Sequence, residues 1–189
     1  MRDYPNIDQL VLASASPRRA ELLASLGLEF EIRIPDIDET PRAGERPQAF
    51  AERLAREKAA AIEIDAETVL IAADTIVTRA GAILGKPVDE ADAVNMLTSL
   101  AGGAHEVITG VCARRGASVH VFSVSTEVVF RALTETEIRA YVAGGDPMDK
   151  AGAYAIQGGA AHMVKAIRGS YTNVVGLPLS ELHEILVSF

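Results

Sequence analysis

The amino-acid sequence predicts a mixed α/β fold, in which helices flank a twisted central sheet. Three observations support this prediction. Segments typical of strands and of helices alternate in the first half of the chain, whereas hairpin-like pairs of strands follow later. The length of 189 residues, with 49% hydrophobic, is enough for a single domain over 1–189 with a buried core.

The first elements are predicted from apolar patterning and from residues that begin or end helices. Residues 10–13 form a short apolar run, typical of a buried strand. A helix follows from Ser16, which can cap it, with Pro17 in its first turn and Gly27 at its end. Apolar and charged residues alternate over 30–34, which predicts a half-buried strand. The apolar residues of that strand are Phe30, Ile32 and Ile34.

The middle of the chain continues the alternation of helices and strands. Residues 35–47 hold three prolines and several acids and are predicted to form a loop. A helix is expected over 47–64, followed by a continuous apolar strand over 69–73 that ends at Asp74. Residues 76–84 suggest a hairpin that turns near Ala80 and Gly81.

The last part of the chain is predicted to be richer in strands. Thr134 and Glu137 have the spacing of a capping box, which predicts a short helix to Val142. The other predicted elements are a helix over 89–100, strands over 105–114 and 118–130, a loop over 143–152, strands near 153–157 and 162–167, and a helix near 179–188.

Composition and charge exclude several classes of protein. The net charge of −8 opposes binding to a nucleic-acid duplex, which requires a cationic surface. No apolar run is long enough to span a membrane, and residues 1–15 lack the layout of a signal peptide, so we expect a cytoplasmic protein. Cys112 is the single cysteine and lies in an apolar run, which predicts a buried structural residue.

A first candidate site is the motif S-A-S-P-R-R at 14–19, between a predicted strand and a predicted helix. The N-terminus of a helix offers free N–H groups and the positive end of a dipole, and both suit a phosphate. The guanidiniums of Arg18 and Arg19 could bind further phosphate oxygens. The alternative is that Ser16 and Pro17 only begin the helix, while the two arginines are solvated.

A second candidate is Asp74 in the motif A-A-D-T at 72–75. A carboxylate at the end of an apolar strand could hold Mg²⁺, or could orient and deprotonate a water molecule. Glu39, in the acidic loop, could be a second ligand, because Mg²⁺ usually takes only one or two carboxylates besides substrate phosphates. The alternative for Asp74 is a loop carboxylate that caps a turn.

Two further motifs offer polar side chains between turn residues. G-A-I-L-G-K-P at 81–87 is one residue too short for a Walker A loop and lacks its Ser or Thr, so it predicts only a lysine, Lys86, held in a stiff turn. Gln157 precedes two glycines, and its amide could read the edge of a nucleobase. The alternative for Gln157 is a turn residue that faces water.

Together these segments resemble the Maf family of nucleoside triphosphate pyrophosphatases. The matching motifs run in order along the chain, and the resemblance covers residues 12–179. They are L-A-S-A-S-P-R-R-A-E-L-L, R-L-A-R-E-K-A, A-A-D-T-I-V, I-L-G-K-P, G-x-x-H-x-V-x-T-G-V, D-K-A-G-A-Y-A-I-Q-G and G-S-Y-T-N-V-V-G-L-P-L.

The resemblance implies a mixed α/β fold similar to that of the inosine triphosphate pyrophosphatases, with two lobes around a cleft, and a homodimer. It implies metal-dependent cleavage, with Mg²⁺ or Mn²⁺, between the α- and β-phosphates of a nucleoside triphosphate. Asp74 would be the catalytic proton acceptor and, with Glu39, a metal ligand. The other residues expected to line the phosphate and metal site are Ser14, Arg19, Lys58 and Lys86.

The resemblance also implies a substrate. Family members that act on dTTP and UTP carry Arg, Thr and Gln at the positions of Arg18, Thr75 and Gln157, whereas the 7-methyl-GTP enzymes tend to differ there. We therefore expect hydrolysis of dTTP and UTP in nucleotide house-cleaning. The alternatives are the same reaction on 7-methyl-GTP or another modified nucleotide, and a nucleotide-binding regulator of cell division. The chain departs from the usual family pattern at Ala155, Ala160 and Met163.

Overall fold

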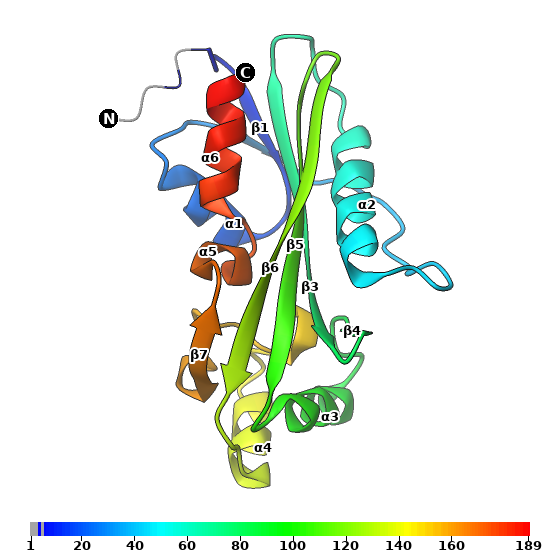
Figure 1. Ribbon diagram of the computed structural model, residues 1–189, viewed down its shortest axis with the longest axis vertical. Helices are drawn as coiled ribbons and strands as arrows, with labels where there is room; N and C mark the ends of the chain where they lie inside the picture. Colours follow the sequence, from blue (N-terminus) through cyan, green and yellow to red (C-terminus); the bar gives the residue numbers. More distant parts are fainter. Residues whose placement is uncertain (1–3, 5) are drawn as a thin grey trace. The chain divides into compact units, whose positions relative to one another are not determined.

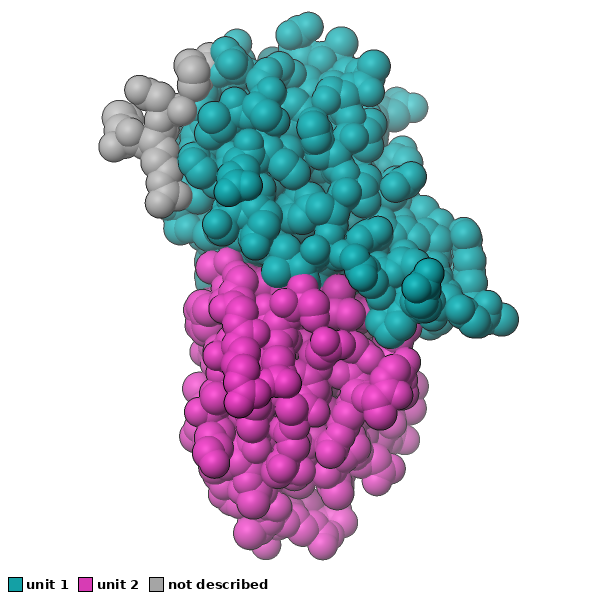
Figure 2. Space-filling view, viewed as in Figure 1, with its two compact units in different colours: residues 1–74, 109–124, 176–189 teal, residues 75–108, 125–175 magenta. Residues whose placement is uncertain are grey.

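The computed structural model describes residue 4 and residues 6–189, so residues 1–3 and 5 of the predicted domain lie outside the described part. The chain divides into two compact units (Figure 2). The first unit comprises residues up to 74 together with 109–124 and 176–189. The second unit comprises 75–108 and 125–175.

The central sheet is mixed, as predicted, and has the strand order β2-β1-β3-β5-β6-β7, with β4 paired to β3 (Figure 1). β1 runs parallel to both β2 and β3, whereas the β3–β4 and β6–β7 pairs are antiparallel. The strands are β1 (Leu10–Ala13), β2 (Glu31–Arg33), β3 (Val69–Arg79), β4 (Ala82–Leu84), β5 (Ala104–Arg115), β6 (Ser118–Phe130) and β7 (Val164–Arg168).

Six α-helices and two short 3₁₀ helices are found among the residues that the structure describes. They are α1 (Pro17–Ala24), α2 (Pro47–Ala60), α3 (Glu90–Leu100), α4 (Glu135–Ala143), η1 (Ala151–Ala153), η2 (Ala161–Met163), α5 (Tyr171–Val175) and α6 (Leu179–Ser188). None of these helices is both long and apolar enough to cross a membrane.

The core of the first unit has two layers because β1 is buried on both faces. Leu10 and Leu12 belong to a cluster that includes residues of α1 and α6, whereas Val11 belongs to a cluster that includes residues of α2. Figure 1 shows α1 and α6 on the side of these strands away from α2. Successive side chains of a strand point to opposite faces, so a strand covered on both faces is apolar throughout. This explains the continuous apolar run at 10–13.

The core of the second unit contains a group of ring side chains. The rings of His105, Phe130 and Tyr154 meet edge to face, with centroids 4.9 to 5.4 Å apart. Helices α3 and α4 pack against each other and bury Leu97 and Ile138, among other residues. The capping box predicted at the start of α4 is present.

Two sequence predictions about strands were wrong. The strand predicted over 30–34 is present as β2, but it is not half-buried as expected, because Ile32 is 51% exposed on this three-residue edge strand. Ile34 lies beyond the end of β2 and is 68% exposed. Residues 153–157 form no strand, because Gly152 and Ala153 adopt left-handed backbone angles (φ of 67° and 60°) that an extended strand does not allow.

Two predicted element ends were also wrong. Helix α2 ends at Ala60 rather than at Ile64, and the apolar residues beyond it pack onto the core from a loop. Strand β3 does not end at Asp74 but continues to Arg79. Asp74 therefore lies within a strand, and the alternative of a loop carboxylate is wrong. The hairpin at Ala80 and Gly81 is confirmed, with positive φ at both residues.

Candidate active site

The turn between β1 and α1 holds a buried hydroxyl. The Oγ atom of Ser14 accepts hydrogen bonds from the backbone N–H of Ser16 (3.1 Å) and from Nη1 of Arg19 (3.3 Å). Ser16 caps α1, as predicted, because its Oγ accepts from the backbone N–H of Arg19 (3.4 Å). The Ser14 hydroxyl thus ties the turn to a guanidinium.

Arg19 is held inward and is not a solvated surface residue. Its Nε donates a hydrogen bond to the carbonyl oxygen of Gly176 (2.8 Å). Burial is the main cause that lowers the pKa of Arg19, and the charge of Arg18 lowers it further. The carboxylates of Asp74 and Glu39 act in the opposite direction and raise it. Arg19 therefore lies within electrostatic reach of both predicted metal ligands.

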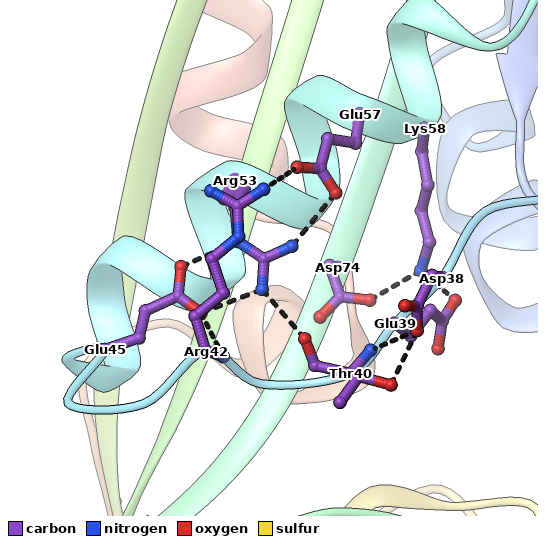
Figure 3. Close-up of polar contacts among 9 residues, drawn as sticks. All are labelled: Asp38, Glu39, Thr40, Arg42, Glu45, Arg53, Glu57, Lys58 and Asp74. Atoms are coloured by element: carbon purple, nitrogen blue, oxygen red, sulfur yellow. Dashed lines mark hydrogen bonds and ion pairs between the residues drawn. The ribbon is translucent and has the colours of Figure 1, made fainter.

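Asp74 and Glu39 share one ammonium group. The Nζ atom of Lys58 lies 2.6 Å from Oδ1 of Asp74 and 2.7 Å from Oε1 of Glu39 (Figure 3). Asp74 is only 7% exposed, so its charge requires a partner, whereas the side chain of Glu39 is 47% exposed. The structure thus brings together three of the four predicted catalytic residues, from a loop, a helix and a strand.

The chemistry of these donors fits a hard divalent cation. Two carboxylates converge on one positively charged group, and Mg²⁺ commonly uses one or two carboxylates together with substrate phosphates. Within the described part of the chain, no group of three or more His, Cys, Asp or Glu side chains is arranged to hold a metal ion. The two carboxylates therefore fit a metal ion whose remaining ligands would be oxygen atoms of the substrate.

Helix α2, which carries Lys58, lies directly against strand β5. A Cβ atom added at Gly110 would lie 2.4 Å from the backbone C and O atoms of Ala51. Only glycine leaves room for this contact between backbones. The hydroxyl of Ser123 also donates to Oε1 of Glu52 (2.6 Å), which ties α2 to β6.

Lys86 lies in the second unit, in the turn after β4, with an exposed side chain. The carbonyl oxygen of Gly85 accepts a hydrogen bond from the backbone N–H of Gly152 (3.0 Å), and Pro87 is buried. These contacts fix the segment on both sides of Lys86, while the predicted stiffness of the turn stays a prediction.

Gln157 also lies in the second unit and is exposed in a turn over 156–160. The backbone N–H of Gly158 donates to the carbonyl oxygen of Ala155 (3.1 Å), and that of Gly159 donates to Oδ2 of Asp146 (3.3 Å). The turn is therefore fixed through its backbone, while the Gln157 side chain faces outward. Thr75, the first residue of this unit, is half-buried in β3.

The departures from the family pattern do not strain this turn. Ala160 has a φ of −83°, which any L-residue adopts, and its side chain is fully buried. Among described residues other than glycine, positive φ occurs at Ala80 and Ala153 but not at Ala155. Met163 is also fully buried and fills core space. These substitutions are therefore compatible with the backbone that presents Gln157.

Other family motifs have structural roles. The side-chain amide of Asn173 donates to the carbonyl oxygen of Val107 (3.0 Å) and to Oγ1 of Thr126 (2.9 Å), and the same Oγ1 accepts from the backbone N–H of Ser170 (3.1 Å). The G-S-Y-T-N segment thus anchors α5 to strands of its own unit.

The buried histidine and cysteine are structural as well. Nε2 of His105 lies 2.8 Å from the hydroxyl of Tyr154, and burial, with a smaller effect of Arg79, lowers the pKa of His105 to about 4. Cys112 is buried in the first unit, where burial raises the pKa of its thiol. This confirms the structural interpretation of the cysteine.

Comparison with solved structures identifies the fold class. The chain resembles a HAM1 protein from Coxiella burnetii, with a TM-score of 0.50 and 18% sequence identity over 96% of this chain and 99% of that one. At this identity the likeness concerns the fold alone, and it supports the mixed sheet with flanking helices.

Sequence comparison identifies the family. Residues 9–189 match the model of the Maf family, described as Maf-like protein, and the chain belongs to that family. A dTTP/UTP pyrophosphatase of Geobacter sulfurreducens is 60% identical over 181 residues, which cover 94% of this chain and 95% of the relative. A dTTP/UTP pyrophosphatase of Vibrio cholerae is 48% identical over 97% of this chain and 99% of its own length.

Proposed function

We propose that this chain is a nucleoside triphosphate pyrophosphatase that hydrolyses dTTP and UTP to the monophosphate and pyrophosphate. The observation that carries the proposal is the cluster in which Lys58 joins Asp74 and Glu39, with Arg19 in electrostatic reach. The names of the relatives support the substrate, because proteins 48–60% identical to this chain are called dTTP/UTP pyrophosphatases.

The cationic residues of the cluster bind and neutralise the triphosphate. Arg19 offers directional donors and Lys58 a compact ammonium, and both are held by neighbours before substrate arrives. Most of the acceleration in phosphoryl transfer comes from positioning and charge stabilisation. The preformed contacts of Arg19 and Lys58 supply both.

Asp74 accepts a proton from the water that attacks the α-phosphorus, and pyrophosphate leaves. Its position in a strand fixes the carboxylate, and Lys58 orients it through a 2.6 Å hydrogen bond. Asp74 and Glu39 would hold Mg²⁺ or Mn²⁺ when it is bound, and the cation supplies further neutralisation of the phosphate oxygens.

Arg18, Thr75 and Gln157 select the base. Gln157 is exposed in a turn whose backbone is fixed, so its amide is available to donate to and accept from one edge of a nucleobase. The homodimer implied by the family resemblance and the cytoplasmic location expected from the sequence stay predictions.

The test is pyrophosphate release from a panel of triphosphates (dTTP, UTP, CTP, GTP, ATP and 7-methyl-GTP), with Mg²⁺ and then with Mn²⁺. We expect the fastest release from dTTP and UTP, with the monophosphate as co-product. A preference for 7-methyl-GTP would keep the reaction but overturn the roles given to the three selecting residues. Nucleotide binding without release from any triphosphate would instead support a regulatory protein, such as one that acts in cell division.

A further inference from the structure

The loop that carries Glu39 has no regular secondary structure of its own. Residues 34–46 lie between β2 and α2, and most of them are exposed. Glu39 nevertheless reaches Lys58 at 2.7 Å. Because an irregular exposed segment has large conformational freedom, other contacts must fix this loop.

Those contacts converge on Arg53, a residue of α2 whose side chain is only 13% exposed. Its Nε and Nη2 atoms donate to the two carboxylate oxygens of Glu45, at 2.7 and 2.8 Å (Figure 3). Nη1 donates to Oε2 of Glu57 at 2.9 Å, and Nη2 also donates to the carbonyl oxygen of Thr40 at 3.2 Å. Every nitrogen of the guanidinium is therefore engaged.

Arg53 binds the loop at Thr40 and Glu45, which both follow Glu39 in the chain. Glu45 also accepts a hydrogen bond from the backbone N–H of Arg42 (3.1 Å), which fixes the backbone at this end of the loop. On the other side of Glu39, Oδ1 of Asp38 accepts from the backbone N–H and the hydroxyl of Thr40, at 2.9 and 2.6 Å. Thr40 is thus fixed by Asp38 and by Arg53, and Glu39 lies between Asp38 and Thr40 in the chain.

The pair of Arg53 and Glu45 is a strong one for a loop contact. Bidentate pairs of arginine and carboxylate are stronger and more directional than single hydrogen bonds. Hydrogen bonds from Arg53 lower the pKa of Glu45 to about 2, so this carboxylate stays ionised at neutral pH. The ring of Phe50 lies 5.3 Å from the Arg53 guanidinium carbon, which further fixes the guanidinium.

We propose that Arg53 is a positioning residue, which clamps the Glu39 loop onto α2 and thereby sets the affinity of the Asp74–Glu39 pair for a divalent cation. The guanidinium of Arg53 donates to Glu45, Glu57 and Thr40, so we place its effect in the loop that carries Glu39. The effect on catalysis rests on the proposed function, whereas the effect on the loop does not. The R-L-A-R-E-K-A motif thus contributes Arg53 and Glu57 as well as Lys58.

The first test is Arg53→Gln, compared with the wild-type chain in the absence of nucleotide. Hydrogen–deuterium exchange of the peptide covering 38–46 should become at least about tenfold faster, because the loop loses its attachment to α2. The affinity for Mn²⁺ alone, measured by electron paramagnetic resonance, should fall by roughly 10- to 100-fold. This is the usual loss when residues that hydrogen-bond and orient metal ligands are removed.

Two further variants make the test specific. Arg53→Lys keeps the charge but loses the bidentate geometry, so its loop exchange and Mn²⁺ affinity should lie between those of wild type and Arg53→Gln. Arg139→Gln is the matched control, because Arg139 forms an exposed ion pair with Glu135 four residues earlier on α4. It should leave loop exchange and Mn²⁺ affinity unchanged.

Wild-type loop exchange and wild-type Mn²⁺ affinity in folded Arg53→Gln would overturn the inference. If that variant does not fold, Glu45→Gln replaces it, and unchanged values there would be equally decisive. If the wild-type chain bound no Mn²⁺, the proposed effect of Arg53 on metal affinity would be refuted. The exchange rates would still show whether Arg53 fixes the loop onto α2. Absence of pyrophosphate release from any triphosphate, together with faster loop exchange in Arg53→Gln, would overturn the proposed function but not the clamp.

Discussion

Most predicted site residues of the first compact unit form polar contacts within it, whereas Lys86 and Gln157 of the second unit present exposed side chains. Ser14, Arg19, Lys58 and Asp74 are held by hydrogen bonds and ion pairs within their own unit. Lys86 and Gln157 are exposed on turns whose backbones are fixed. The polar groups of the first unit are therefore organised before substrate arrives, whereas Lys86 and Gln157 are left available for it.

The largest effect should come from Asp74→Asn. The amide keeps the shape of the carboxylate but accepts no proton, so turnover of dTTP should fall by at least about 10²- to 10⁴-fold. Single-turnover measurement of pyrophosphate release reports this loss. Folding should be checked by circular dichroism, and turnover near the wild-type rate in the folded variant would refute the role of Asp74.

The next largest effect should be a loss of folding stability when a glycine is replaced by alanine, tested at one position in each unit. In Gly152→Ala the new methyl group would lie 2.8 Å from the side chain of Val77 at a φ of +67°, so overpacking of about 1–3 kcal/mol adds to a backbone cost of about 1–2 kcal/mol. Gly110→Ala would meet backbone atoms of Ala51 and should destabilise by about 1–3 kcal/mol or more. Urea unfolding measures both values.

Gly85→Ala is the control for both glycine variants, since nothing lies within 4 Å of a Cβ atom at Gly85 and its φ is not positive. Its free energy of unfolding should stay within about 0.5 kcal/mol of wild type. A stable Gly110→Ala would show that α2 can move away from β5, and the close contact of backbones would then not be required.

Gln157→Glu should change selection and leave the fold intact. The substitution replaces the donor of the amide by an acceptor, so the ratio of kcat/KM for dTTP over 7-methyl-GTP should fall by about tenfold or more, equivalent to one hydrogen bond of about 1.4 kcal/mol. The melting temperature should not change, because the side chain is exposed. An unchanged ranking of substrates would remove Gln157 from the selecting residues.

The smallest effect should be on how folding stability depends on pH in acid, tested at one glutamate in each unit. Hydrogen bonds from Arg53 lower the pKa of Glu45 to about 2, and hydrogen bonds from Arg131 and Thr134 lower that of Glu137 to about 2. A carboxylate with a lowered pKa stabilises the fold above its ordinary value of about 4.5, and this contribution is lost as the pH falls toward 2. Glu45→Gln and Glu137→Gln should each make stability less dependent on pH in this window, as urea midpoints at pH 6, 4 and 3 would show. A pH dependence equal to that of wild type in either variant would contradict the ion pair at that position.

Local signals were sufficient to predict much of the fold. The apolar run at 10–13, the turn at Ala80 and Gly81 and the capping box of α4 each depend on neighbouring residues, and all three are confirmed. The strand near 153–157 was wrong because Gly152 and Ala153 adopt left-handed backbone angles, and Gly152 contacts Gly85, a residue distant in the sequence. The exposure of Ile32 likewise depends on the place of β2 at the edge of the sheet.

The candidate site was predictable in its residues but not in its contacts. Sequence reasoning named Asp74 and Glu39, and the family resemblance added Lys58. These residues are up to 35 positions apart in the sequence, and no local pattern shows that one ammonium joins the two carboxylates. Arg53 was missed because its main partner, Glu45, lies in an irregular loop. The spacing of Arg53 and Glu57, four residues apart on a predicted helix, was the one local signal for that cluster.

The contact between Gly110 and Ala51 has a consequence for how this enzyme could be diversified. Any side chain at position 110 would push against the main chain of α2, the helix that carries Lys58. A mutational library that varies this position should therefore return almost only glycine. Gln157, the proposed base-selecting residue, is exposed and is not restricted in this way, so libraries that seek new substrate preferences should vary this position.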